Sequence, residues 1–121
     1  MYITMLVMPV PEENIEAYKA WAELSANIFK DYGCTEVVDG WEDFVPKGEN
    51  TDFFRAVNAM EGEKIAFSWQ IWPDKETLFA AEEKMHADGV LDAHGAPPYD
   101  NKRLIAGCFD SIFAMGRSDS A

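Results

Sequence analysis

The chain has little positive charge and no long uninterrupted apolar run. Ten Lys and Arg residues stand against 22 Asp and Glu among 121 residues, which gives a formal net charge of -12. Such a surface repels phosphate backbones and anionic lipid headgroups, so neither nucleic acid nor a membrane is expected as a partner. The most apolar stretch, residues 2–11, is too short to span a bilayer and lacks the features of a signal peptide. The sequence therefore predicts a cytoplasmic protein.

Residue patterns that carry familiar chemistry are also scarce. The two cysteines, Cys34 and Cys108, match no metal-binding spacing, and both are expected to be thiols that pack in the interior. His86 and His94 lie eight residues apart, which fits no metal motif, and surface positions are the simpler interpretation. Ser68 has no neighbouring residues typical of a catalytic triad, and no glycine-rich phosphate loop is present. No metal and no other cofactor is therefore expected.

The first half of the chain predicts a strand, a helix and a second strand. Residues 2–8 are rich in β-branched, aromatic and thioether side chains, and prolines follow them. A helix is expected from Pro11 to Tyr32, because apolar residues then recur at spacings of three and four and Gly33 follows as a terminator. Residues 34–41 read as the second strand and residues 42–51 as a loop.

The second half repeats that order. Residues 53–60 predict a short strand or a hairpin arm, and residues 65–72 a strand whose odd positions are large and apolar. Asp74 is expected to cap a helix that runs to residue 88, residues 93–101 to form a loop, and residues 103–115 to form a last strand. Residues 1–115 are thus expected to be a single domain, followed by a flexible tail over residues 116–121.

This order predicts a ferredoxin-like βαββαβ plait of the α+β class. Two right-handed strand–helix–strand units give a four-stranded antiparallel sheet with both helices on one face. The other face is then bare, yet the first and last strands are apolar on both sides. Because monomers rarely expose apolar patches of that size, a second copy of the sheet is the simplest cover, in a dimeric α+β barrel. The expected space between the sheets is lined partly by Ser68, Gln70, Trp72, Cys108 or Asp110.

Several segments resemble one known family over nearly the whole chain. They are Trp41-Glu-Asp-Phe-Val-Pro-Lys-Gly48, Thr51-Asp-Phe53, Ala56-Val57, Phe67-Ser-Trp69, Trp72-Pro73, Lys84-Met85, and Pro98-Tyr-Asp-Asn-Lys-Arg103 with Gly107 and Phe109. Together they resemble the YbaA-like family of small uncharacterised bacterial proteins, a domain of unknown function. The resemblance implies a dimeric α+β barrel and no established activity.

Three classes of function remain open from the sequence. The first is a homodimer whose inter-sheet pocket binds a small organic molecule. The alternatives are a cofactor-independent small-molecule enzyme of the monooxygenase or isomerase type, and a purely structural or partner-binding module. Arg103 suits a ligand carboxylate, although an ion pair with Asp100 is the simpler interpretation. The candidate ligand-binding residues are Ser68, Trp69, Gln70, Trp72, Arg103, Cys108 and Asp110.

Overall fold

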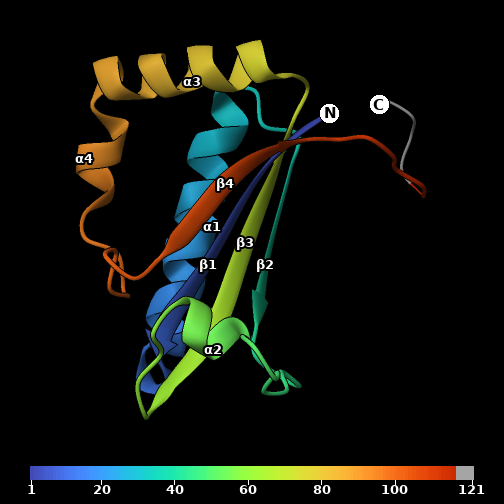
Figure 1. The fold of residues 1–121 in the computed structure, drawn as a ribbon. Helices are drawn as coiled ribbons and strands as arrows, with labels where there is room; N and C mark the ends of the chain where they lie inside the picture. The colour runs from blue at the N-terminus through green and yellow to red at the C-terminus, as the bar shows by residue number, and fades with distance from the viewer. Residues whose placement is uncertain (117–121) are drawn as a thin grey trace.

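The computed structural model describes residues 1–116 (Figure 1). Their elements follow in the order β1 Tyr2–Pro11, η1 Glu12–Asn14, α1 Ile15–Asp31, β2 Glu36–Trp41, α2 Phe53–Ala56, β3 Glu63–Trp72, α3 Lys75–Asp88, α4 Val90–His94 and β4 Ile105–Asp110. Most of the tail expected at residues 116–121 lies outside the described residues.

The strands form one four-stranded sheet in the order β2-β3-β1-β4, and every neighbouring pair is antiparallel. This is the α+β arrangement that the sequence predicted. The register also fixes the two faces, because directly opposed residues of an antiparallel pair point to the same side. Leu6 lies between Ser68 of β3 and Ala106 of β4, and Ser68 also faces Asp39 of β2. These four residues therefore share one face.

The two long helices are stabilised in different ways: α3 is capped at both ends, whereas α1 depends on packing against the sheet. The carboxylate of Asp74 accepts a hydrogen bond from the Thr77 backbone N–H and so caps the start of α3. Gly89, at φ 70°, ends α3 in the left-handed conformation that glycine adopts without strain. Helix α1 has no side-chain cap and is held by packing, with Tyr18 buried against the sheet.

Two clusters of buried side chains join the helices to the sheet, and both lie on the same face. One cluster contains Cys34, Trp72, Leu78, Ala81 and Met85, and the other contains Met8, Val10, Tyr18 and Ala66. The face under the helices thus carries the even-numbered residues of β1 and β3. Cys34 packs in the interior as predicted.

Several expected elements were wrong in type or extent. The first strand was expected to end before the prolines, but β1 continues through Pro11, and α1 begins only at Ile15 after the short η1. Residues 53–60 were expected to be extended, but Asp52 caps a single helical turn, α2, by accepting the Arg55 N–H. Part of the loop expected at residues 93–101 is instead the end of helix α4, which starts directly after Gly89. The last strand ends at Asp110 and not at residue 115, because its pairing with β1 stops where Tyr2 faces Asp110.

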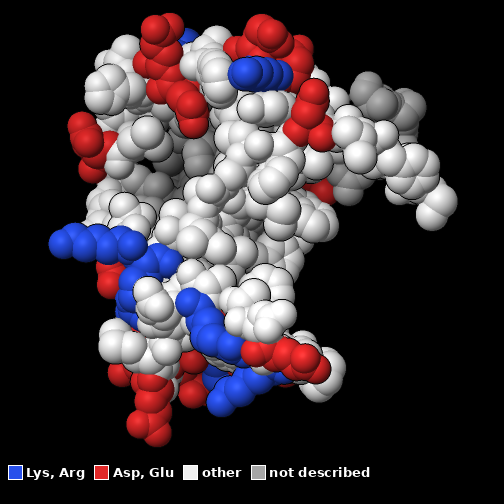
Figure 2. Space-filling model, viewed as in Figure 1, with Lys and Arg blue, Asp and Glu red and all other residues white. Residues whose placement is uncertain are grey.

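The sheet face away from the helices is mainly apolar across all four strands; one charged exception is Glu36 of β2, which lies opposite Ile71. This face presents Ile3, Met5, Val7, Val38, Phe67, Trp69, Ile71, Ile105 and Phe109, which we call the open face. Phe109 remains 54% exposed and Ile105 44% exposed. The indole Nε1 of Trp69 is buried and has no hydrogen-bond partner within residues 1–116. Figure 2 shows uncharged surface across the strands, with the charged groups gathered near the helices and around α2.

An extended arm, residues 111–116, leaves the sheet after β4. The Ser111 N–H donates to the Met1 carbonyl, and the chain then runs away from the body of the molecule (Figure 1). Ile112 is 98% exposed, and Phe113 and Met115 are exposed almost as fully. The arm therefore adds apolar surface to a molecule that already carries an uncovered apolar sheet face.

Candidate ligand-binding cavity

A cavity of about 400 Å³ lies between the helix-facing side of the sheet and helix α1. Figure 2 shows the molecule hollowed between the helices α3 and α4 and strand β4. The lining residues come from every layer of this side: Leu6, Met8, Tyr18, Trp21, Ala22, Ser25, Phe29, Val37, Asp39, Ser68, Gln70, Leu91, His94, Pro97, Tyr99 and Asn101. Its size is at the small end of the range for ligand pockets, roughly 300–1,000 Å³.

The floor of the cavity is set by strand register. Asp39 faces Ser68 across the β2–β3 pair, and Val37 faces Gln70 one step further along. Ser68 is 8% exposed and Gln70 is 5% exposed. The Gln70 Oε1 accepts a hydrogen bond from the Trp72 indole at 3.3 Å. The Ser68 hydroxyl, in contrast, has no hydrogen-bond partner among the described residues.

The roof is one face of α1. Tyr18, Trp21, Ala22, Ser25 and Phe29 recur at spacings of three and four residues, so one stripe of the helix lies over the cavity. The Tyr18 hydroxyl donates to Asp39 Oδ1 at 2.8 Å. Burial, and after it the Asp39 carboxylate, raise the pKa of Tyr18 far above its usual range. Tyr18 therefore stays a hydroxyl donor and holds the carboxylate of Asp39 in place.

His94, at the end of α4, forms a wall of the cavity. Its Nε2 lies 2.6 Å from the Ser25 Oγ, and its ring stacks on Trp21 with centroids 3.6 Å apart and planes 12° apart. The other ring nitrogen, Nδ1, is buried and has no hydrogen-bond partner within residues 1–116. The expectation of a surface histidine was therefore wrong for His94, because helix α4 brings it back against α1. His86 is exposed.

Aromatic rings surround the polar groups. Tyr18 and Tyr99 have centroids 6.2 Å apart, and Trp21 meets Tyr99 edge-on at 6.3 Å. Burial also raises the pKa of Tyr99. Buried polar groups normally pair within the protein or with water. The cavity thus combines an apolar wall with several hydrogen-bonding groups that the protein itself leaves unpaired.

The structure separates the residues that the sequence placed in one pocket. Ser68 and Gln70 both line the cavity, but it lies on the helix side of the sheet and not in a space between two sheets. Trp72 shares their face but is fully buried in the core beneath α3. Trp69 points the opposite way, to the open face. The strand β3 alternates, so its even and odd residues cannot serve the same site.

Cys108 and Asp110 lie on edge strand β4, on the same sheet side as Ser68. Both are exposed, and Cys108 Sγ lies 3.6 Å from the Thr4 Oγ1. Neither lines the cavity. The expected buried thiol was wrong at Cys108, because β4 has no neighbour on its outer side.

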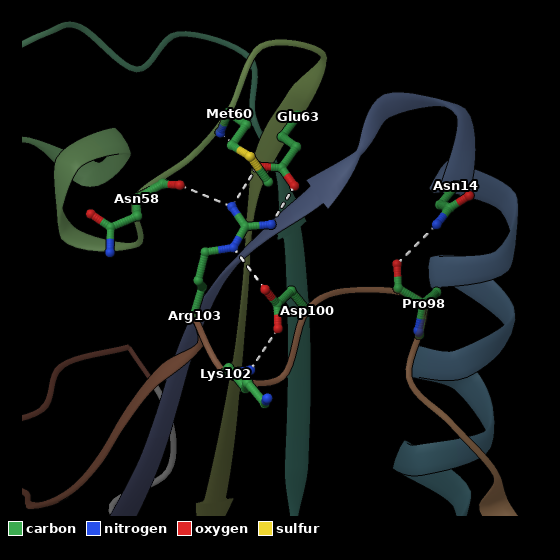
Figure 3. Close-up of polar contacts among 8 residues, drawn as sticks. All are labelled: Asn14, Asn58, Met60, Glu63, Pro98, Asp100, Lys102 and Arg103. Carbon is green, nitrogen blue, oxygen red and sulfur yellow. Dashed lines mark hydrogen bonds and ion pairs between the residues drawn. The ribbon is translucent and has the colours of Figure 1, made fainter.

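Arg103 is occupied by three partners within the protein (Figure 3). Its Nη1 and Nη2 donate to the two carboxylate oxygens of Glu63 at 2.7 Å each, and its Nε donates to Asp100 at 2.9 Å. Nη1 also donates to the Asn58 carbonyl. The Glu63 side chain is 9% exposed and that of Arg103 is 15% exposed. These bonds favour the structural interpretation of Arg103: they tie the approach to β4 to the start of β3.

The loop before β4 is fixed at a second point. The Asn14 side-chain amide donates to the Pro98 carbonyl at 3.1 Å (Figure 3). This bond and the Arg103 network hold residues 98–103, and with them Tyr99 and Asn101, against the mouth of the cavity. Among residues 1–116, no three His, Cys, Asp or Glu side chains gather in a way that would hold a metal ion.

Sequence reasoning missed most of the polar and aromatic groups of the cavity, and the polar ones nearest the sheet floor and the α1 roof include Tyr18, Ser25, Asp39 and His94. Two of them left a signal. Ser25 interrupts an otherwise apolar stripe of α1, and Asp39 stands between Val37 and Trp41 on the inward face of β2. A polar residue repeated on a buried face in two elements indicates a site. His94 left no such signal, since its position depends on the path of α4.

These features define an α+β protein of the ferredoxin-like class. The crystal structure of a dimeric ferredoxin-like protein from an uncultured marine organism matches it with a TM-score of 0.52 at 12% sequence identity, over 97% of this chain and 100% of that one. Residues 1–101 match the family model described as Protein of unknown function (DUF1428), and the chain belongs to this family.

Relatives in Escherichia coli and Shigella flexneri agree with that assignment. The chain is 40% identical over 112 residues to the uncharacterized protein YbaA of Escherichia coli K12, a match that covers 92% of this chain and 96% of the relative. The same values hold for YbaA of Shigella flexneri. The family resemblance predicted from the sequence is confirmed. No helix among residues 1–116 is long and apolar enough to cross a membrane.

Proposed function

We propose that this protein is a homodimer in which each protomer binds one small organic molecule in the cavity beneath helix α1. The main support for this proposal is the cavity. It has a volume of about 400 Å³ and is lined by apolar side chains and by polar groups without protein partners. Empty polar cavities are costly, and pockets of this composition are typical ligand sites.

The binding proposal is tested by filling the cavity from two directions. Ser68→Leu adds volume at the floor, and Ala22→Leu adds volume at the roof. We expect natively purified wild-type protein to retain small-molecule mass in native mass spectrometry, and both variants to lose it. Folding of each variant is checked by circular dichroism. Wild-type protein without an adduct that also shows no response to a fragment library in ligand-observed NMR would overturn the proposal.

The homodimer proposal rests on the open face and the arm. Soluble monomers rarely leave contiguous apolar patches larger than a few hundred Å² uncovered. Here Phe109 and Ile105 of the edge strand are exposed beside Trp69, and the arm adds Ile112 and Phe113. A second copy seated sheet to sheet covers all of these at once, and a twofold axis makes the same face serve both partners. The marine ferredoxin-like protein is described as dimeric, which supports self-association but does not indicate which face is used.

Matched substitutions test the dimer. Phe109→Asp places a charge on the open face, whereas Leu24→Asp places one at a similarly exposed position of α1, 47% against 54%. In sedimentation velocity at micromolar concentration we expect the wild type and Leu24→Asp to be dimers and Phe109→Asp to be a monomer. A monomeric wild type, or a dimer that survives Phe109→Asp, would contradict the use of this face.

One contact favours a second candidate, the enzymatic alternative. The Ser25 Oγ and His94 Nε2 lie 2.6 Å apart in the cavity, within the distance at which histidine takes a hydroxyl proton. Turnover of a bound molecule by the wild type, abolished in His94→Gln with binding retained, would support an enzyme. Retention of the molecule unchanged would support the binding role.

A further inference from the structure

The chemistry of the cavity lining selects among small molecules. Asp39 is the one acidic residue in the lining, and no Lys or Arg of the described chain lines it. Of its carboxylate oxygens, Oδ1 accepts the Tyr18 hydroxyl, whereas Oδ2 has no hydrogen-bond partner among residues 1–116. An anion placed beside this carboxylate would be repelled, and a neutral guest would leave it without a counter-charge in an apolar setting.

The aromatic walls point in the same direction. Tyr18, Trp21, Phe29 and Tyr99 line the cavity, and the rings of Tyr18 and Tyr99 lie at a tilt of 52° with centroids 6.2 Å apart. The faces of such rings carry negative potential and attract cations, and desolvated sites of this kind recognise substituted ammonium groups. Ser68 stands directly opposite Asp39 across the β2–β3 pair, where its free hydroxyl can accept from or donate to a guest.

The net charge of the whole molecule also influences which ligands approach the cavity. With a net charge of -12, the surface raises the local concentration of cations near the cavity mouth and lowers that of anions. The long-range field, the aromatic walls and the half-buried carboxylate of Asp39 therefore all favour a cationic ligand over an anionic one.

We propose that the cavity takes a small organic cation, an amine or a quaternary ammonium compound whose charged head lies at Asp39 among the aromatic rings. This inference rests on the proposed binding function and narrows its ligand class. The site needs no metal and no contribution from a second copy, because all of its groups come from one chain.

The test uses three probes of one shape and different charge: choline, its neutral isostere 3,3-dimethyl-1-butanol, and the anion 3,3-dimethylbutanoate. Binding to the full chain is followed at pH 7 by the tryptophan indole N–H signals in NMR. Trp21 reports on the cavity and Trp69 on the open face. We expect choline to shift the Trp21 signal and to bind about tenfold more tightly than the alcohol, a difference of ~1.4 kcal/mol. The anion should leave the signal unchanged.

Two variants assign the effect to the carboxylate. Asp39→Asn keeps an oxygen for the Tyr18 hydroxyl but removes the charge, and it should bring choline down to the affinity of the alcohol. Asp43→Asn, an exposed loop position, changes the net charge equally and should leave the selectivity intact. An equal loss of selectivity for choline over the alcohol in Asp39→Asn and Asp43→Asn would overturn the assignment to Asp39.

The outcomes separate this inference from the proposed function. Choline and the alcohol binding equally to the wild type would overturn the cation inference and leave small-molecule binding in place. A cavity that binds none of the three probes would overturn the inference, while the native mass spectra decide the binding function by themselves. If Asp39→Asn fails to fold, the comparison of the three probes on the wild-type protein still tests the inference, because the selectivity for choline is measured without any variant.

Discussion

The ring of Phe67 occupies the space that a side chain at Gly40 would need. A Cβ at position 40 would lie 2.1 Å from Phe67 Cε2, and the two residues face each other across β2 and β3. The absence of a side chain on one strand therefore lets an aromatic ring of the next strand lie flat over it. This packing shapes one side of the open face.

Replacing Gly40 by alanine should force the Phe67 ring out of its position. We expect Gly40→Ala to lower the free energy of unfolding by about 1–3 kcal/mol, as other overpacked sites do. Urea denaturation measures the change. Phe67→Leu in the Gly40→Ala background should restore part of the loss, because leucine needs less room there. A Gly40→Ala protein as stable as the wild type would contradict the contact.

The Arg103–Glu63 pair predicts a defined pH dependence. The hydrogen bonds from Arg103 lower the pKa of Glu63, so the stabilisation is present above the pKa of an unfolded glutamate, ~4.3, and is lost as the pH falls through the lower folded value. Glu63→Gln should cost about 2 kcal/mol at pH 7. The difference in the free energy of unfolding between Glu63→Gln and the wild type should become smaller towards pH 3. Exposed Glu61→Gln is the control, and a gap independent of pH would refute the ionic origin.

The two thiols should react at very different rates. Cys108 is exposed, whereas Cys34 is 7% exposed and its Sγ donates to the carbonyls of Glu36 and Ile71. Burial raises the pKa of the Cys34 thiol, which further lowers its thiolate fraction. Ellman's reagent should therefore modify one thiol per chain quickly and the second only after denaturation. Cys108→Ser should remove the fast phase, and two equal rates would contradict the placement of β4.

The arm should strengthen the proposed dimer without stabilising the protomer. Replacing both Ile112 and Phe113 by serine removes apolar area that is 98% and 80% exposed in the isolated chain. Burial of a single large apolar side chain contributes about 1.5–3 kcal/mol, so we expect the dimer dissociation constant to rise by roughly tenfold or more. Sedimentation equilibrium measures it, with Leu24→Ser as control. An unchanged constant would exclude the arm from the interface.

The order of elements could be predicted because each long element has a clear local signal. The periodicity of α1 and the Asp74 cap of α3 are visible in the sequence, and both were confirmed. The single turn α2 was missed because one capping residue, Asp52, overrides the extended preference of its neighbours. The cap at Asp52 determines the conformation of this turn, but α2 is too short to show a helical periodicity in the sequence.

The location of the cavity could not be predicted because β3 carries no marker of which face is inward. Its large residues Phe67 and Trp69 suit a core, yet they lie on the open face, and Ser68 and Gln70 lie under the helices. Hydrophobicity orients a strand only when one side meets water. In this sheet a cavity accommodates the polar side, so the usual rule does not apply.

The alternation of β3 makes it a shared wall between two compartments. Its even-numbered side chains meet whatever fills the cavity, and its odd-numbered ones form the surface offered to a twin. Any guest that displaces the strand would alter self-association by some factor, and reciprocity requires self-association to alter the affinity for that guest by the same factor. Binding in the cavity and dimerisation would then be coupled directly through the backbone of β3.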